Sequence, residues 1–286
     1  MLFSNIIRQH WAALRALLIL TVLTGLLYPV LVWAMAQLPG LSAGAAGSLI
    51  EADGKPVGSS LIGQSFSRPD GTPLPQYLQP RPSAAGQGYD TMSTGASNLG
   101  PEDIVDTEGH TSLLTTVCTR SREIGAANGV DGSRPFCTND GVGAVLSVLG
   151  QRDGRGNVVH PTRVISVNQL CATTTTPFLA TYEGVRVECN SGPDYTSGQI
   201  VSIAGSTAEP QVPADAVTAS GSGLDPDISP AYAELQIGRI AQARGLRPEQ
   251  VRAVIAEHTS GRPLGFMGEP HVNVLAVNLA LDRLGG

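Results

Sequence analysis

Four cysteines carry the clearest chemistry in this 286-residue chain, and all lie in its middle part: Cys118, Cys137, Cys171 and Cys189. They form no C-x-x-C pair, and their wide spacing argues against a zinc site. A reactive catalytic thiol is a weaker interpretation still. In an oxidising compartment they would form two disulfides. Four cysteines allow three pairings; the sequential pairing closes the two smaller loops, but the sequence alone does not choose.

The motifs of the common catalytic sites are missing. A phosphate-binding loop needs a lysine followed by Ser or Thr, whereas the single lysine, Lys55, precedes Pro56. The sequence also lacks an S-x-x-K pair, a G-x-S-x-G nucleophile elbow and an H-E-x-x-H zinc helix. Gly141-Val142-Gly143 begins like a dinucleotide fingerprint, but Leu146 stands at the third glycine position. We therefore expect no catalytic residues, no metal and no tightly bound cofactor.

The charge balance argues against nucleic acid as a partner. The chain has 18 basic and 24 acidic side chains, which gives a net charge of −6. Such a surface repels nucleic acid and anionic lipid headgroups.

One apolar segment, residues 16–38, must position the rest of the chain. It carries no charged residue, and as a helix rising about 1.5 Å per residue it would be about 35 Å long, enough to cross a bilayer. Arg8 and Arg15 precede it and the first charge after it is Glu51, so the positive-inside bias predicts a cytoplasmic N-terminus. The alternative is a signal peptide cleaved near Ala34-Met35-Ala36, although the apolar core of a signal peptide usually spans only ~7 to 15 residues.

Three residues within the segment could shape helix contacts in the membrane. Thr21 and Gly25 have the small-xxx-small spacing that lets another helix approach closely, and ordinary lipid-facing positions are the alternative. Pro29 removes a backbone donor and crowds the carbonyl of Gly25, which predicts a kink.

Beyond this segment the patterns predict an α+β domain in which C-terminal helices pack on a small sheet. Asp53-Gly54 signals a hairpin, and helices are expected from Pro230 to about Arg244, from Pro248, and from Asn273. The predicted organisation is a cytoplasmic N-terminus (1–15), a transmembrane helix (16–38), the first part of an extracytoplasmic α+β domain (39–101), a β-rich insertion with the four cysteines (102–211) and a mainly helical second part (212–286).

A series of short motifs gives the chain a recognisable order. They are Leu23-Thr24-Gly25-Leu26-Leu27-Tyr28-Pro29, Ile62-Gly63-Gln64, Arg81-Pro82-Ser83-Ala84, Ser97-Asn98-Leu99-Gly100-Pro101, Val212-Pro213-Ala214-Asp215, Ile228-Ser229-Pro230-Ala231 and Gly265-Phe266-Met267-Gly268-Glu269-Pro270. Together they resemble the C subunit of the bacterial Kdp potassium-transporting ATPase, the KdpC family, over residues 16–101 and 212–283. Two features depart from that family: the long cysteine-bearing segment between these blocks, and the loop Ser93 to Ser97, which differs from the family's Ser-Gly-Gly-Ser form.

The resemblance implies a non-hydrolysing subunit of a high-affinity, ATP-driven potassium uptake pump in the bacterial inner membrane. Its partners would be a channel-like potassium-binding subunit, a P-type ATPase subunit and a small membrane peptide, and the complex would handle K⁺ and ATP. The family's C subunit is needed for assembly and is described as a catalytic chaperone that supports ATP binding by the hydrolysing subunit. With residues 39–286 outside, that effect would have to pass through helix contacts in the membrane.

Under this transport interpretation, two polar loop systems are candidates for contacting a partner or the ion path. The candidates are Arg81, Asp90, Ser97 and Asn98 in the first, and Ser220, Ser222, Asp225 and Asp227 in the second. Carboxylates at a pore mouth would raise the local cation concentration, and a glycine-rich loop could offer carbonyls to K⁺. The simpler alternative is that these side chains cap turns and pair with arginines.

A function of another class is also compatible with the sequence. The chain could be a membrane-anchored extracytoplasmic binding domain or hydrolase, with the cysteine-bearing insertion as its specificity element. The missing nucleophile and metal motifs argue against the hydrolase.

Overall fold

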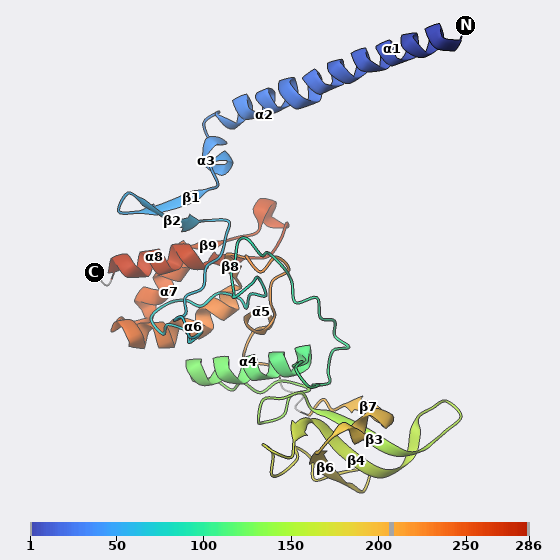
Figure 1. Cartoon of the computed structure of the whole chain (residues 1–286). Helices are drawn as coiled ribbons and strands as arrows, with labels where there is room; N and C mark the ends of the chain where they lie inside the picture. Colours follow the sequence, from blue (N-terminus) through green and yellow to red (C-terminus); the bar gives the residue numbers. More distant parts are fainter. Residues whose placement is uncertain (1, 206–208, 285–286) are drawn as a thin grey trace. The chain divides into compact units, whose positions relative to one another are not determined.

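A computed structural model describes residues 2–205 and 209–284. The chain divides into two compact units, residues 1–61 and residues 62–286. The first holds a long N-terminal helix and a hairpin, and the second is a mixed α/β domain with two disulfides (Figure 1). The predicted class, an apolar helix followed by an α+β domain, is confirmed.

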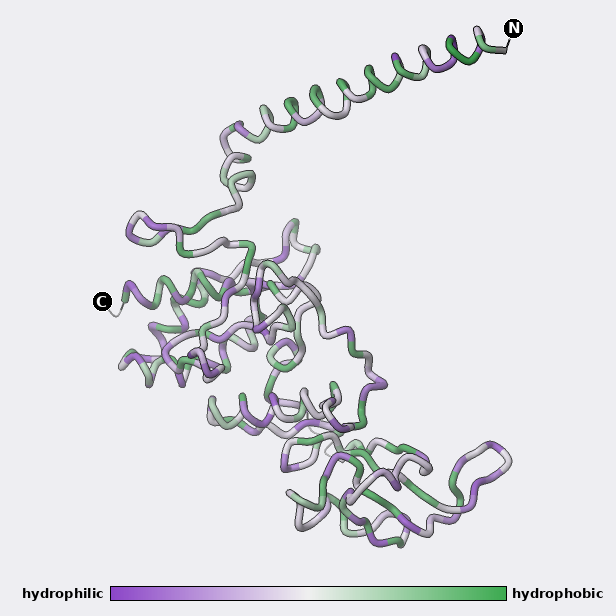
Figure 2. The backbone as a smooth tube through the Cα atoms, in the orientation of Figure 1, coloured by the Kyte–Doolittle hydropathy of each residue, from purple (hydrophilic) through white to green (hydrophobic). Residues whose placement is uncertain are grey.

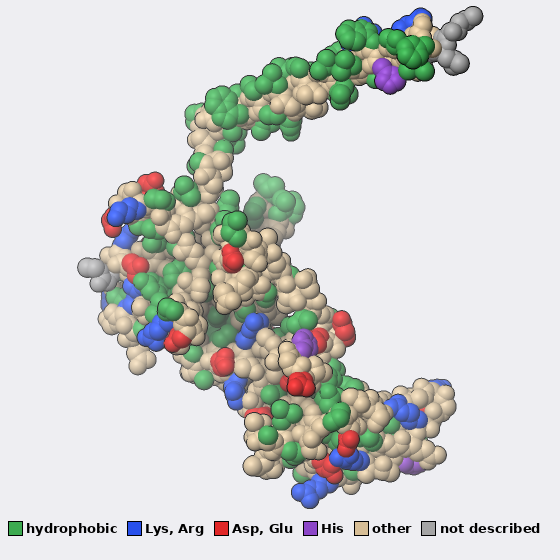
Figure 3. Space-filling view, in the orientation of Figure 1, with side chains coloured by type: hydrophobic (Ala, Val, Ile, Leu, Met, Phe, Trp, Pro, Cys, Tyr) green, Lys and Arg blue, Asp and Glu red, His purple; other side chains and the backbone are tan. Residues whose placement is uncertain are grey.

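The first unit begins with one uninterrupted helix made of α1 (Leu2–Val22), the π-helical η1 (Leu23–Leu27) and α2 (Tyr28–Ala36). Its stretch Phe3–Ala36 contains an 18-residue window with a mean hydropathy of 2.2, none of which is buried against protein. Most residues along it are hydrophobic by hydropathy (Figure 2), and hydrophobic side chains cover much of its visible face (Figure 3). Residues 16–35 of this helix carry no charged side chain and are exposed, which is typical of a helix surrounded by lipid. The helix begins well before residue 16, where the predicted span starts.

A π-helical turn lies directly before Pro29. The Tyr28 N–H donates to the Leu23 carbonyl, five residues back, and the Thr24 hydroxyl donates to the Leu20 carbonyl at 2.7 Å. Pro29 has no N–H and crowds the preceding turn. Widening that turn to the π form accommodates the ring. The kink expected from the sequence at Pro29 stays a prediction; the structure has a π-helical turn directly before it.

The short helix α3 (Ser42–Ala45) leads to a hairpin of β1 (Leu49–Ala52) and β2 (Lys55–Ser59). The two strands pair antiparallel. Asp53 (φ 52°) and Gly54 (φ 71°) both lie in the left-handed region, as a type I′ turn requires. The hairpin predicted at Asp53-Gly54 is confirmed.

Three helices near the C-terminus, α6 (Pro230–Arg244), α7 (Pro248–Glu257) and α8 (Val274–Leu284), build the larger core of the second unit. The Ser229 hydroxyl accepts from the Tyr232 N–H and Gly245 ends α6 at φ 66°, so the predicted caps form. The same part of the chain contains a small three-stranded antiparallel sheet. Its strand order is β8 (Asp227–Ile228), β10 (His271–Asn273), β9 (Thr259–Ser260).

The middle of the chain forms α4 (Leu113–Asn128) followed by a five-stranded sheet in the order β5-β6-β4-β3-β7. The strands are β3 (Val145–Arg152), β4 (Val158–Leu170), β5 (Thr181–Tyr182), β6 (Val185–Asn190) and β7 (Gln199–Ser202). β3 and β4 pair antiparallel, whereas β4 and β6 pair parallel. This sheet has its own core around Leu146 and Val164.

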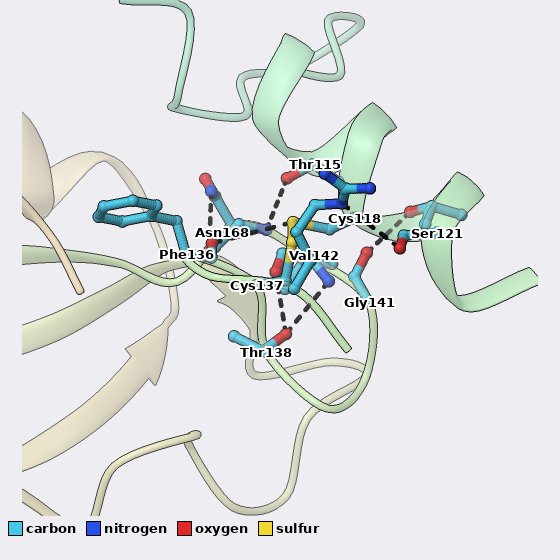
Figure 4. The surroundings of a disulfide bond; sticks show 12 residues. Thr115, Cys118, Ser121, Phe136, Cys137, Thr138, Gly141, Val142 and Asn168 are labelled. Carbon is cyan, nitrogen blue, oxygen red and sulfur yellow. Dashed lines mark hydrogen bonds between the residues drawn. A yellow bond between two sulfur atoms is a disulfide. The ribbon is translucent and has the colours of Figure 1, made fainter. Parts of the chain in front are cut away.

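All four cysteines are paired, in the sequential arrangement: Cys118–Cys137 with Cα atoms 5.4 Å apart, and Cys171–Cys189 at 5.0 Å. Both separations suit a disulfide. The first links α4 to the loop before β3, beside Thr138, whose hydroxyl donates to the Val142 carbonyl (Figure 4). The second closes the crossover between the parallel strands β4 and β6.

Candidate functional site

Two of the predicted polar residues form an ion pair that joins the two loop systems. Arg81 Nη1 lies 3.0 Å from Asp225 Oδ2, and Arg81 Nη2 donates to the Thr218 carbonyl at 3.4 Å. Both side chains are mostly buried, 25% and 30% exposed. Arg81 Nε is buried without a partner among the described residues. The pair therefore holds loops 144 residues apart in sequence against each other.

Ser83 and Tyr89 reinforce this junction. The Ser83 hydroxyl donates to the Gly223 carbonyl at 2.7 Å and accepts from the Tyr89 N–H at 2.8 Å. The Tyr89 hydroxyl donates to the Arg81 carbonyl at 2.8 Å. Burial, and then the charge of Asp225, raise the pKa of Tyr89 above its ordinary value, so the phenol stays a hydrogen-bond donor.

The serines of the second loop are engaged locally. The Ser220 hydroxyl accepts from the Gly223 N–H at 3.0 Å, and the Ser222 hydroxyl accepts from the Leu224 N–H at 3.1 Å. Gly223 has φ 70°, and a Cβ there would stand 2.7 Å from the Ala85 Cβ. A glycine is thus required both by the turn and by the close approach of the first loop.

Asp227 is the second carboxylate of this region. It accepts from Asn273 Nδ2 at 3.1 Å, and His271 Nε2 lies 3.8 Å away. Burial raises the pKa of Asp227, an effect that the Asn273 hydrogen bond and His271 oppose. The backbone N–H of Asp227 donates to Asp225 Oδ1 at 3.1 Å, which brings the two carboxylates into one turn.

The other predicted residues lie at the exposed rim. The Asp90 carboxylate accepts from the Met92 N–H at 2.9 Å, a local turn bond. Ser97 and Asn98 are exposed, and no residue that the structure describes hydrogen-bonds to their side chains. The structure therefore unites Arg81, Asp225 and Asp227 and leaves Asp90, Ser97 and Asn98 outside the junction.

Two buried amides fix the proline-rich segment that carries Arg81. Gln236 on α6 exchanges hydrogen bonds with the backbone N–H and carbonyl of Gln79, at 2.8 and 3.2 Å. Asn278 on α8 does the same with Leu78, at 2.8 and 3.0 Å. Each amide pairs with one backbone N–H and one carbonyl of this proline-rich segment, as a neighbouring strand would in a sheet.

A cavity of about 820 Å³ opens beside this segment. Its walls include Arg81 and Tyr89 together with residues that the sequence analysis did not single out: Arg120 on α4, and Tyr232, Gln236 and Arg239 on α6. Two of these could have been found: Tyr232 and Gln236 are spaced i, i+4 on the buried face of a predicted helix, where Gln is unusual. Arg120 could not, because α4 itself was not predicted.

Comparison with known proteins gives full-length similarity. The profile of a family described as "KdpC: K+-transporting ATPase, c chain" matches residues 10–130 and 196–283. Similar proteins come from Kineococcus radiotolerans (37% identical over 278 residues, 97% of this chain and 95% of the relative) and Streptomyces coelicolor (37% over 295 residues, 98% and 95%). A third, from Mycobacterium tuberculosis, is 34% identical over 277 residues, 97% and 99%. Each is named as a potassium-transporting ATPase KdpC subunit, and the aligned regions are long enough to include residues 131–195, which the family profile leaves unmatched.

Proposed function

Because the chain belongs to the KdpC family of K⁺-transporting ATPase subunits, we propose that it supports assembly of the Kdp pump and ATP binding by a separate hydrolysing subunit. The observation that carries this proposal is the full-length similarity combined with one exposed apolar helix. The partners we propose are a channel-like potassium-binding subunit, a P-type ATPase subunit and a small membrane peptide.

The topology belongs to the same proposal. We place the N-terminus in the cytoplasm and the second unit outside the inner membrane, on the strength of Arg8 and Arg15 before the apolar stretch. Two disulfides suit that compartment. Any influence on ATP binding inside the cell would then pass through the helix, as a coupling between conformations.

A contribution to K⁺ entry is the second part of the proposal. Arg81 already balances the charge of Asp225, whereas no arginine or lysine that the structure describes pairs with Asp90 or Asp227. The field that could attract a cation therefore comes mainly from Asp90 and Asp227.

Purification of the tagged chain from membranes in a mild, uncharged detergent tests the assembly role. We expect larger membrane subunits and a K⁺-stimulated ATPase activity to copurify with the tag. A chain that copurifies with neither would favour the anchored binding domain or hydrolase instead.

A further inference from the structure

The cavity beside the proline-rich segment carries more positive charge than its surroundings balance. Four arginines line it, Arg68, Arg81, Arg120 and Arg239, against one glutamate, Glu123. Arg81 is paired with Asp225. Glu123 and Asp70 interact electrostatically with Arg120 and Arg68, although neither forms an ion pair, and no carboxylate within the described parts of the chain forms one with Arg239. The excess is notable in a chain of net charge −6.

Arg239 shows how this charge is held. Its guanidinium donates only to neutral acceptors, among them Asn128 Oδ1 at 3.0 Å, Gln236 Oε1 at 2.6 Å and the Tyr77 carbonyl at 3.1 Å. Burial lowers the pKa of Arg239 and of Arg120 from their ordinary values, but an arginine stays charged at any physiological pH. Arg239 is a half-buried cation without an ion-pair partner among the described residues, and Glu123 balances Arg120 only in part. This favours an anion in the adjoining space.

Two donors remain free to meet such an anion. Tyr232 is only 3% exposed, and its hydroxyl has no hydrogen-bond partner among residues 2–205 and 209–284 although the side chain lines the cavity. Burial raises its pKa to about 12, so the phenol keeps its proton. Arg120 uses one bond, from Nη1 to the Val217 carbonyl at 3.1 Å, which leaves the rest of its donor fork available.

Apolar walls complete the cavity. Pro73, Pro75, Pro80, Ile124 and Ala127 line it with the polar groups, and its volume is in the range of small-molecule sites. We propose that the cavity binds a small organic anion, one carboxylate or phosphate head group on an apolar body, with Arg120 and Tyr232 as its direct donors. The inference does not depend on the pump function.

Calorimetric titration of the full chain, in uncharged detergent, with phenyl phosphate tests the site. We expect saturable binding that Arg120→Gln weakens by about tenfold or more, since a hydrogen bond to a charged group is worth ~1.5–3 kcal/mol. Tyr232→Phe should weaken it severalfold and Arg120→Lys less than Arg120→Gln. The matched control is Arg252→Gln on α7, an exposed arginine paired with Glu234 and outside the cavity; it should leave the affinity unchanged.

Two further probes sharpen the result. Inorganic phosphate should bind more weakly than phenyl phosphate, because it leaves the apolar walls unused. Nanodiscs containing phosphatidylglycerol would displace phenyl phosphate if the natural head group is a lipid's, and nanodiscs of phosphatidylcholine alone would not; no displacement by either identifies a soluble anion. No saturable binding, or binding equal in the wild type, Arg120→Gln and Tyr232→Phe, would overturn the proposal.

Discussion

Arg81 forms the ion pair between the two polar loops, which hydrogen bonds such as that from Ser83 to Gly223 also join. The sequence left two interpretations of Asp225 open: a carboxylate that attracts cations, or a partner of an arginine. The guanidinium of Arg81 joins the loops and at the same time neutralises Asp225. A carboxylate engaged in this way contributes less to a cation-attracting field than a free one.

The ion pair should have a measurable coupling energy. In a double-mutant cycle of Arg81→Gln and Asp225→Asn, we expect a coupling of about 1 kcal/mol in the free energy of unfolding, because both groups are mostly buried. Urea unfolding of the full chain in detergent measures it. The control cycle is Arg252 with Glu234, which are 51% and 54% exposed and should couple less; equal couplings would show that the loop junction has no special role.

Asp227 should give the protein a distinct pH dependence. Burial raises its pKa in the folded chain. The protonated carboxyl therefore contributes stability that is fully present below the ordinary pKa, and this contribution is lost as the pH rises through the raised pKa. The stability of Asp227→Asn relative to the wild type should therefore be higher at about pH 7 than at about pH 3. Thermal unfolding at both pH values measures this.

Asp131 is the matched control, with the opposite sign. Hydrogen bonds from Ser133 lower its pKa, so its contribution is present above the ordinary pKa and lost as the pH falls through the lowered one. The stability of Asp131→Asn relative to the wild type should be lower at neutral pH than in acid. The same direction for both variants would contradict the pKa assignments.

Asp90 and Asp227 carry the K⁺ prediction. Replacing both by Asn should weaken the apparent K⁺ affinity of the pump at low ionic strength, and added salt should reduce the difference because it screens the field. Arg81→Gln together with Asp225→Asn should change the affinity less, since that pair carries no net charge. An unchanged affinity in the double variant would end the ion-capture role.

At the scale of elements, local sequence signals predicted the turns and helix caps that depend on a few neighbouring residues. The hairpin turn at Asp53-Gly54 and the cap at Ser229 depend on backbone preferences of a few residues, and both form. The parallel pairing of β4 with β6 depends on contacts between residues distant in sequence, so no local pattern predicted it. α4 was not predicted although Ser112 caps it and Gly129 ends it. Its buried positions hold Thr115, Cys118, Ser121 and Gly125, which give no apolar helical period.

The two disulfides should differ in how easily they are reduced. Cys118 is only 1% exposed, whereas Cys171 is exposed at the end of β4. A mild reductant should therefore open Cys171–Cys189 first, as alkylation followed by mass measurement would show. Replacing both members of either pair by Ala should cost about 2–4 kcal/mol of stability. Simultaneous opening of the two bonds would contradict the difference in access.

The N-terminal helix should have a contact face at Gly25. A Cβ at Gly25 would meet only the Thr21 side chain, at 3.9 Å, so Gly25→Leu is tolerated within the chain and obstructs only a neighbouring helix. We expect this variant to copurify with less of the pump. Ala16→Leu makes a similar enlargement on the opposite side of the helix, at about 3.6 residues per turn, and should have little effect; equal losses would remove the contact face.

At the scale of the whole molecule, the sequence predicted the order of the parts and the polar loops but not the cavity. The segment that carries the motif Arg81-Pro82-Ser83-Ala84 is held by two buried amides, Gln236 and Asn278. The cavity needs α4, α6 and the proline-rich segment together, and a single sequence does not reveal which distant segments meet.

Membrane sidedness is the premise on which the proposed function most depends. Gly221 is exposed with open space around it, so Gly221→Cys is a suitable reporter for the second unit, and Ser4→Cys serves for the N-terminus. The native cysteines are all paired and give no background. In spheroplasts, an impermeant maleimide should label Gly221→Cys at once and Ser4→Cys only after lysis. Labelling of Ser4→Cys first would place the domain in the cytoplasm and contradict the proposal that the helix is its route to the ATP-driven subunit.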